Sequence, residues 1–193
     1  AKKDLRTILQ LIPDMNDTVP IQSLNGRKHS FPVCTDACGG NKAGGGYVTP
    51  YKYKAWQYNA KMKKACIAVL EGDCVERYLQ DNAQEHRGQI LDMYCDNQVV
   101  VACIIKGRSR NKHLNSMVQR ILLLCYQHDL YLQIQYINTK ENILADAVSR
   151  QQWDLFHKHW GTYTLFAGCR AKDLQRLKEA DPSDPTSALP NRV

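Results

Sequence analysis

The 193-residue chain has the length of one domain of ordinary size with extensions, and it carries a formal net charge of +7. Its hydrophobic content of 44% and charged content of 23% are typical of globular proteins and exclude a disordered or fibrous chain. No apolar run reaches the roughly 18 residues of a membrane span, and the first residues lack a signal-peptide pattern, so we expect no membrane partner. The positive charge favours an acidic partner, of which nucleic acid is the commonest, although charge alone identifies none.

The eight cysteines favour neither a disulfide framework nor a zinc site. Cys34 and Cys38 are close in sequence, but no Cys or His lies at zinc-finger spacing from them. Most of the others lie in apolar stretches, where a free thiol behaves as a small buried hydrophobic group. Free thiols are typical of reducing compartments, so we expect a cytoplasmic or nuclear protein.

The first third of the chain predicts a lead-in followed by a hairpin and a helix. Residues 1–28 are expected to form a short amphipathic helix and a polar connector that follow an upstream segment. Residues 31–38 predict a buried strand, and the glycine-rich residues 39–46 predict a hairpin-like turn with extended chain after it. A long helical pattern then covers residues 59–81.

The middle of the chain alternates strands and helices. Residues 90–95 predict a strand, and a helix capped by Asp96 or Asn97 follows it. Residues 111–128 place apolar side chains at the i, i+3 and i+4 spacing of an amphipathic helix. Residues 130–137 alternate apolar and polar side chains, which predicts a half-buried strand.

The last predicted helix of the domain covers residues 141–150, so the order of elements predicts an α/β domain over residues 29–150, with a mixed sheet and helices on its faces. Residues 151–193 form a C-terminal extension with an aromatic helix and a proline-rich tail that argues against further regular structure. Helical spacing of the aromatic side chains favours packing over base stacking, and it also suits a protein partner on this helix. These aromatic residues are Trp153, Phe156 and Trp160.

Three aspartates fall at or after the ends of predicted strands. Asp36 lies near the end of the first strand, Asp96 directly follows residues 90–95, and Asp146 lies on the helix that follows residues 130–137. Ligands gather at the C-terminal ends of strands in α/β sheets, so these acids can meet in one crevice. Clustered carboxylates repel one another unless a cation offsets their charge, and Mg²⁺ prefers oxygen ligands. Each aspartate taken alone also fits a helix cap or a solvent-facing residue, and only their joint placement favours a metal site.

Three segments resemble the reverse-transcriptase-linked ribonuclease H of gypsy-like and DIRS-type retrotransposons. They are TDAC at 35–38 before the glycine-rich turn, CDNQVVV at 95–101, and IQYINTKENILADAVSR at 134–150, which is the most specific. The resemblance covers about residues 31–150 and implies a ribonuclease H-like mixed five-stranded sheet flanked by helices, with short N- and C-terminal extensions. It implies a retrotransposon enzyme or a domesticated derivative, with an upstream reverse-transcriptase domain or other polyprotein segments as partners.

The resemblance also implies an activity, the two-metal hydrolysis of the RNA strand of RNA/DNA hybrids with Mg²⁺ or Mn²⁺. By this resemblance Asp36, Asp96 and Asp146 are three of four metal-binding acids, with two ions bound in the active enzyme. The partner is then an RNA/DNA hybrid or another nucleic acid.

The fourth acid departs from the family pattern, because its position falls on Met62 or Ala65, neither of which binds a metal. Spacing offers Glu71 as a replacement, with Asp73 and Glu76 as weaker alternatives. Without a fourth acid the chain would be a catalytically degenerate domain that binds nucleic acid or protein partners. A Glu71 within ligand distance of the aspartates favours the enzyme, and a Glu71 that faces solvent favours the binding domain.

Two basic clusters near the predicted site suit the nucleic-acid backbone, although a solvated polar surface is an equally good interpretation of them. Tyr136 stands where cellular and retroviral ribonucleases H carry a histidine, and the gypsy-like enzymes resemble this chain in having tyrosine there. The residues expected to contact nucleic acid are Lys61, Lys64, Asn97, Lys106, Arg108, Arg110, Lys112, Tyr136 and Asn142.

Overall fold

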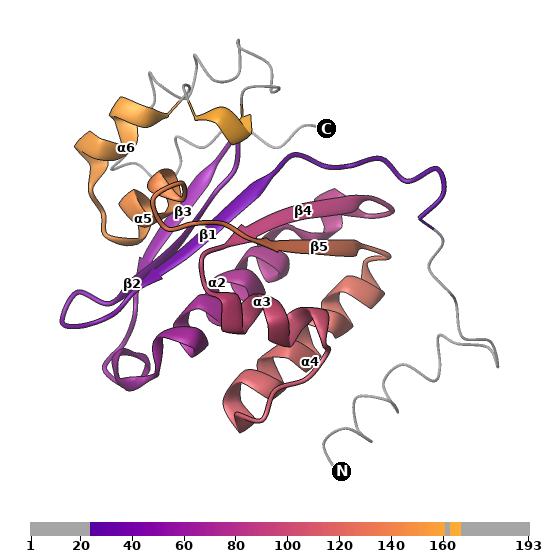
Figure 1. The fold of residues 1–193 in the computed structure, drawn as a ribbon, viewed down its shortest axis with the longest axis horizontal. Coiled ribbons are helices and arrows are strands. Elements are labelled where there is room, and N and C mark those ends of the chain that lie inside the picture. Colours follow the sequence, from indigo (N-terminus) through magenta and orange to yellow (C-terminus); the bar gives the residue numbers. More distant parts are fainter. Residues whose placement is uncertain (1–23, 161–162, 167–193) are drawn as a thin grey trace.

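The computed structural model describes residues 24–160 and 163–166, so the predicted N-terminal helix and the proline-rich tail lie outside the described residues. The described residues form a five-stranded mixed sheet in the order β3-β2-β1-β4-β5, with helices on both faces (Figure 1). This arrangement confirms the predicted α/β class and the mixed five-stranded sheet. None of the helices in this part of the chain combines the length and the apolar character needed to cross a bilayer.

The sheet combines an antiparallel meander with two parallel strands. The strands β1, β2 and β3 pair in antiparallel fashion, whereas β4 lies parallel to β1 and β5 lies parallel to β4. The C-terminal ends of β1, β4 and β5 therefore meet at one edge of the sheet, where Thr35 pairs with Cys95 and Cys95 with Tyr136. The strands are β1 (Val33–Cys38), β2 (Gly44–Val48), β3 (Tyr53–Gln57), β4 (Ile90–Cys95) and β5 (Tyr131–Tyr136).

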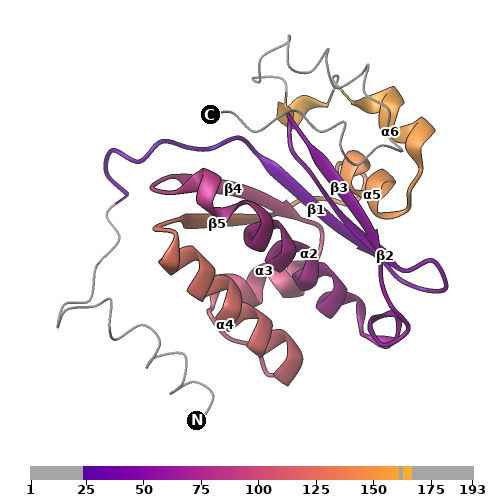
Figure 2. The ribbon, with the colours of Figure 1, turned by 180° about the vertical axis from the view of Figure 1, so that it is seen from behind.

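Two helical layers cover the sheet, as Figures 1 and 2 show from opposite sides. One face packs against α2, α3 and α4 in the larger hydrophobic core, and the other packs against α5, α6 and η3 in a second core. The α-helices are α2 (Ile67–Asn82), α3 (Gln98–Ile105), α4 (Lys112–Gln127), α5 (Ile143–Ser149) and α6 (Trp153–His159). The short 3₁₀ helices are η1 (Met62–Lys64), η2 (Ala83–His86) and η3 (Thr164–Phe166).

Two element boundaries differ from the sequence prediction. Gly44–Val48 is strand β2, so only the first part of the predicted turn over residues 39–46 is a turn. The helix predicted over residues 59–81 begins only at Ile67, because the extended backbone at Ala65 and Cys66 separates it from η1. A periodic run of apolar residues does not reveal this break, which two local backbone conformations decide.

The aromatic side chains of α6 and of its C-cap residue pack into the second core, as their helical spacing predicts. Phe156 and Trp160 are each 1% exposed, and their rings lie 4.8 and 5.0 Å from the ring of Tyr53 on β3. The described part of the C-terminal extension therefore completes the core on this face of the sheet. Its buried rings are not available to stack on bases.

Three glycines of β2 allow α2 and α5 to approach the sheet closely. A Cβ atom on Gly45 would lie 2.7 Å from Cys74 Sγ on α2, and one on Gly46 would lie 2.6 Å from Val148 Cγ1 on α5. Because α2 carries Glu71 and α5 carries Asp146, the glycines set how closely these two acids approach β1.

Gly45→Ala should lower the free energy of unfolding by about 1–3 kcal/mol, since the added methyl group overpacks the contact between β2 and α2. Urea unfolding followed by circular dichroism measures the change. Gly39→Ala is the matched control, because a Cβ atom there would meet nothing within 4 Å. Equal stability of the two variants would show that α2 does not need this close approach.

Candidate metal centre

Three carboxylates meet at the edge of the sheet where β1 and β4 end. Asp36 lies in β1, Asp96 directly follows β4, and Glu71 reaches them from the second turn of α2. One oxygen of each carboxylate lies within 4.8 Å of the other two, and we call this group the acidic cluster. Asp36 and Glu71 are each 3% exposed, so Glu71 joins the aspartates and does not face solvent.

Burial raises the pKa of two carboxyl groups of the acidic cluster, those of Asp36 and Glu71. Burial raises the pKa of Asp36 to about 7, although the hydrogen bond from Ser149 Oγ lowers it. The charges of Asp96 and Asp146 raise this pKa further. Burial likewise raises the pKa of Glu71, and the charges of Asp36 and Asp96 raise it further. The cluster therefore holds protons where a divalent cation would offset its charge.

The weaker alternatives for the fourth acid lie outside the cluster. Asp73 Oδ2 pairs with Arg77 Nε at 2.7 Å, one turn along α2. Glu76 Oε2 accepts a hydrogen bond from Arg120 of α4 at 2.7 Å, which ties the two helices together. Of the three candidate acids on α2, only Glu71 approaches the aspartates.

Asp146 lies outside the acidic cluster. Its Oδ1 pairs with Arg150 Nε at 2.7 Å, one turn along α5. It is still near enough for its charge to raise the pKa of Asp36. The sequence predicts four acids together, whereas the structure brings three within ligand distance and holds the fourth in an ion pair.

Asn142 joins the strand that carries Asp36 to the helix that carries Asp146. Its Nδ2 donates to the carbonyl oxygen of Thr35 at 3.0 Å, and its own carbonyl oxygen accepts from the amide of Asp146 at 3.0 Å. The residue is 0% exposed. The side chain is therefore buried, with Nδ2 bonded to the main chain and Oδ1 without a hydrogen-bond partner among the described residues, and a contact of Asn142 with nucleic acid stays a prediction.

Asn142→Ala should lower the free energy of unfolding by about 1–3 kcal/mol, because the buried carbonyl group of Thr35 loses its donor. Thermal and urea unfolding measure the loss. Asn41→Ala, at an exposed asparagine in the turn between β1 and β2, is the control and should change stability by less than about 0.5 kcal/mol. Wild-type stability of Asn142→Ala would show that this bond does not join β1 to α5.

Two hydroxyl groups that sequence reasoning missed also orient the acids. Thr139 Oγ1 donates to Asp96 Oδ2 at 2.9 Å, and Ser149 Oγ donates to Asp36. Ser149 belongs to the ADAVSR segment, whose match to the family pattern was the available signal. Thr139 had no such signal.

The remaining residues predicted to contact nucleic acid lie at three places. Asn97 caps α3, since its Oδ1 accepts from the amides of Val99 and Val100 at 3.1 and 3.2 Å, which decides between the two predicted caps. Tyr136 is 44% exposed at the end of β5. The exposed basic side chains belong to η1 and its start, and to the segment from the end of α3 to the start of α4; they are Lys61, Lys64, Lys106, Arg108, Arg110 and Lys112.

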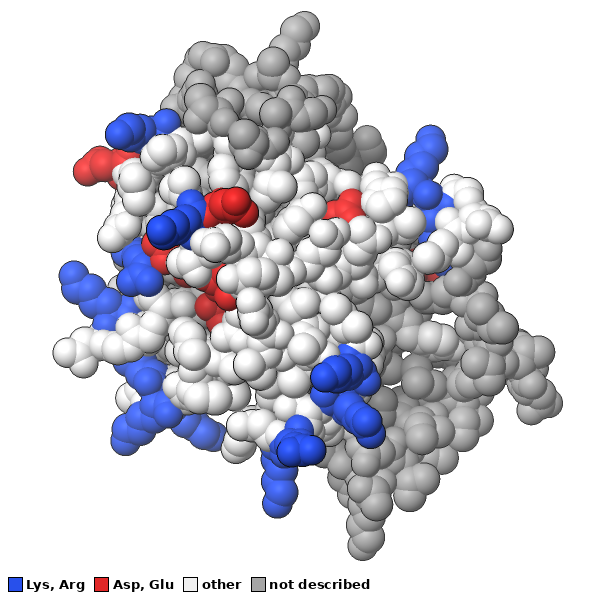
Figure 3. All heavy atoms as spheres, viewed as in Figure 1, with Lys and Arg blue, Asp and Glu red and all other residues white. Residues whose placement is uncertain are grey.

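Basic side chains share a face of the molecule with acidic residues. Figure 3 shows Lys and Arg below and to the left of the acidic residues, over η1 and the turn between β1 and β2. A further group lies at the lower centre, over the connection from α3 to α4. An anionic backbone that crosses this face can contact basic groups while it passes the carboxylates.

Comparisons with known proteins identify the fold. No protein-family model and no curated protein matches the chain. The structure is similar to ribonuclease H1 of the archaeon Halobacterium salinarum NRC-1, with 19% identity and a TM-score of 0.53 over 67% of this chain and 98% of that one. It is also similar to the N-terminal ribonuclease H domain of a Mycobacterium tuberculosis protein, with 15% identity, a TM-score of 0.52 and the same two coverages.

A third similar structure is ribonuclease H1 LC11 in complex with an RNA/DNA hybrid, with 16% identity and a TM-score of 0.54 over 62% of this chain and 93% of that one. At these identities the similarity defines the fold, and the chain has the ribonuclease H-like fold that its sequence motifs predict.

Proposed function

We propose that this protein is a divalent-metal-dependent ribonuclease that hydrolyses the RNA strand of RNA/DNA hybrids. The observation that carries the proposal is the position of Glu71, which adds a third carboxylate to Asp36 and Asp96 at the ends of β1 and β4. The fold supports the same function, since a similar structure was crystallised with an RNA/DNA hybrid.

The acidic cluster suits Mg²⁺ or Mn²⁺, because it offers three hard oxygen ligands close together. Burial and the neighbouring carboxylates raise the pKa of Asp36 and of Glu71, and a bound cation would offset the charge of the cluster. Asp36, Glu71 and Asp96 would hold the metal, and Asp146 would complete a two-ion site once its carboxylate leaves Arg150. When bound, such ions lower the pKa of a water and stabilise the leaving oxygen of a phosphodiester.

The chain's own groups set the geometry for this chemistry. Ser149 and Thr139 fix the carboxylates of Asp36 and Asp96 by hydrogen bonds, and Asn142 keeps β1 next to α5. The basic residues of η1 and of the α3–α4 connection would hold the phosphates. Tyr136, exposed at the end of β5, would contact the sugar-phosphate chain beside the cluster.

The sequence motifs support a more specific origin for this protein. The segment KENILADAVSR supports a retrotransposon origin or a domesticated derivative, and with it an upstream reverse-transcriptase domain or polyprotein segments as partners. The cysteines of the described residues are free thiols, which suits the proposed cytoplasmic or nuclear location.

A panel of labelled substrates tests the proposal. We expect the wild-type protein to cut the RNA strand of a hybrid in Mg²⁺ or Mn²⁺ and to leave DNA duplex intact, because the 2′-hydroxyl distinguishes the two. The control is Asp96→Asn, which removes one ligand and should abolish cleavage. Cleavage that persists in this variant would come from a contaminating nuclease and would contradict the proposal.

The pairing of Asp146 with Arg150 favours a second candidate function, a catalytically degenerate domain that binds nucleic acid or protein. A hybrid that is bound but left intact by the wild-type protein in both metals would establish the binding function. Hybrid cleavage would exclude it.

A further inference from the structure

A cavity of about 310 Å³ lies on the α5 side of the sheet, next to the acidic cluster but separate from it. The loop that follows β5 contacts both, because Thr139 donates to Asp96 while Ile137 and Glu141 line the cavity. The residues that line the cavity are Tyr94, Tyr136, Ile137, Glu141, Tyr163 and Leu165.

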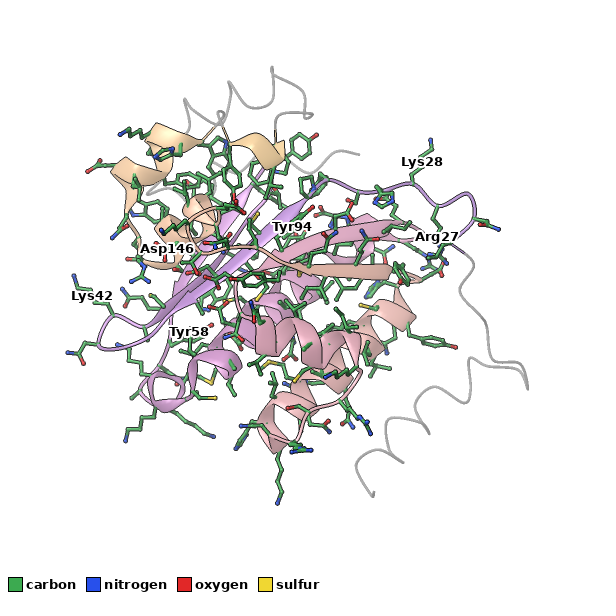
Figure 4. All side chains as sticks on the ribbon, viewed as in Figure 1. Arg27, Lys28, Lys42, Tyr58, Tyr94 and Asp146 are labelled. Carbon is green, nitrogen blue, oxygen red and sulfur yellow. The ribbon has the colours of Figure 1, made fainter. Side chains whose placement is uncertain are left out.

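The walls of the cavity are aromatic and aliphatic with a few polar groups. Tyr163 is fixed against the loop after β5, since its hydroxyl donates to the carbonyl oxygen of Glu141. In the described part of the chain the hydroxyls of Tyr94 and Tyr136 have no hydrogen-bond partner, so both are available to a ligand. Figure 4 shows Tyr94 on β4, below the C-terminal elements. Phenol rings with free hydroxyls suit a planar heterocycle that both stacks and accepts hydrogen bonds.

The size and place of the cavity narrow the class of ligand. Its volume lies at the lower end of the roughly 300–1,000 Å³ range of small-molecule pockets, which suits one base with its sugar and excludes a stacked base pair with its backbones. Tyr136 ends the strand that pairs with β4 at Cys95, directly before Asp96. A nucleic-acid strand whose phosphate lies at the acidic cluster therefore passes the opening of the cavity.

We propose that this cavity binds one unpaired nucleobase of the strand held at the acidic cluster, such as the first base of a single-stranded overhang. The inference rests on the proposed function for the position of that strand. It adds to that function a preference for junctions between hybrid and single strand over fully paired hybrid.

The test uses a hybrid with an RNA overhang whose first unpaired base is the fluorescent 2-aminopurine. All proteins carry Asp96→Asn, so that the substrate stays intact. We expect quenching of the base on binding, and about tenfold tighter binding of the overhang substrate than of a blunt hybrid, from one base stacked on aromatic rings. Leu165→Trp fills the cavity and should remove both effects while blunt-hybrid affinity is unchanged.

Two further variants test whether the overhang preference depends on the cavity. Tyr94→Leu removes one ring from the cavity and should weaken the overhang preference, whereas Tyr131→Leu, at the other end of β5, should leave it unchanged. Equal affinities for overhang and blunt hybrids, or quenching that survives Leu165→Trp, would overturn the cavity proposal. Cleavage of the blunt hybrid by the protein with Asp96 intact reports separately on the proposed function, and quenching by a single strand alone tests the cavity when no hybrid is cut.

Discussion

Glu71→Gln should reduce cleavage of the RNA strand about 100- to 1,000-fold, because a metal ligand contributes several kcal/mol of transition-state stabilisation and each 1.36 kcal/mol is a factor of ten in rate. Glutamine keeps the size of the side chain and its contact with the amide of Ala37, but it removes the charge that a cation needs. Single-turnover cleavage of a labelled hybrid in Mg²⁺ measures the effect.

The matched control for this substitution is Asp73→Asn on the same helix, whose carboxylate pairs with Arg77 away from the cluster and should matter little for the rate. Without metal, Glu71→Gln should be at least as stable as the wild type, since it removes a buried carboxyl group that Asp36 and Asp96 repel when it ionises. A Glu71→Gln variant that cleaves at the wild-type rate would show that Glu71 is not a ligand.

The stability of the metal-free protein should fall as the pH rises from about 4 to about 7. Asp36 has a pKa raised from 3.8 to about 7, so the folded state holds this proton more tightly than the unfolded state does. Its contribution to stability is fully present below pH 4 and is lost as the pH passes 7. A shift of about three units corresponds to about 4 kcal/mol. The raised pKa of Glu71 acts in the same direction.

The measurement is urea unfolding in EDTA at several pH values, and it needs Asp36→Asn for comparison. Burial lowers the pKa of His86 to about 4. The contribution of His86 to the free energy of unfolding therefore rises with pH between about 4 and 6.5, and it opposes the contribution of Asp36. Since both proteins contain His86, their difference removes its contribution and leaves that of Asp36, together with its effect on Glu71. We expect the wild type to lose stability relative to Asp36→Asn over this range, and Mg²⁺ to reverse that loss. Parallel curves for the two proteins would contradict the assignment of Asp36 to an uncompensated acidic cluster.

Sequence patterns predict the elements of this protein well where one local signal dominates. The strand over residues 90–95 follows from an apolar run, and the helix after it follows from two capping candidates, Asp96 and Asn97, of which the structure shows Asn97. The separation of the acids along the chain offers Glu71 as a candidate, and α2, which carries it, lies between β3 and β4 in chain order. These positions depend on chain order and periodicity, which the sequence contains.

The remaining features depend on competition between partners in three dimensions. Asp146 can bind a metal or pair with Arg150, and the structure shows the pair. The motif that contains Asn142 marks it as important, but only the fold shows that its amide faces Thr35 and not solvent. The turn between β1 and β2 is shorter than predicted. Glycines usually indicate turns, whereas Gly45 and Gly46 belong to a strand that two helices approach closely.

The most direct test of this account is the cleavage of a uniformly labelled RNA/DNA hybrid by the wild-type protein as Mg²⁺ is titrated from zero in a metal-free buffer. We expect the RNA strand to be cut to products with 5′-phosphate and 3′-hydroxyl ends, at a rate that rises with Mg²⁺ until the site is saturated and returns to zero in EDTA. A hybrid that stays intact at every Mg²⁺ and Mn²⁺ concentration, while the protein binds it, would contradict the assignment of the acidic cluster as a catalytic metal centre.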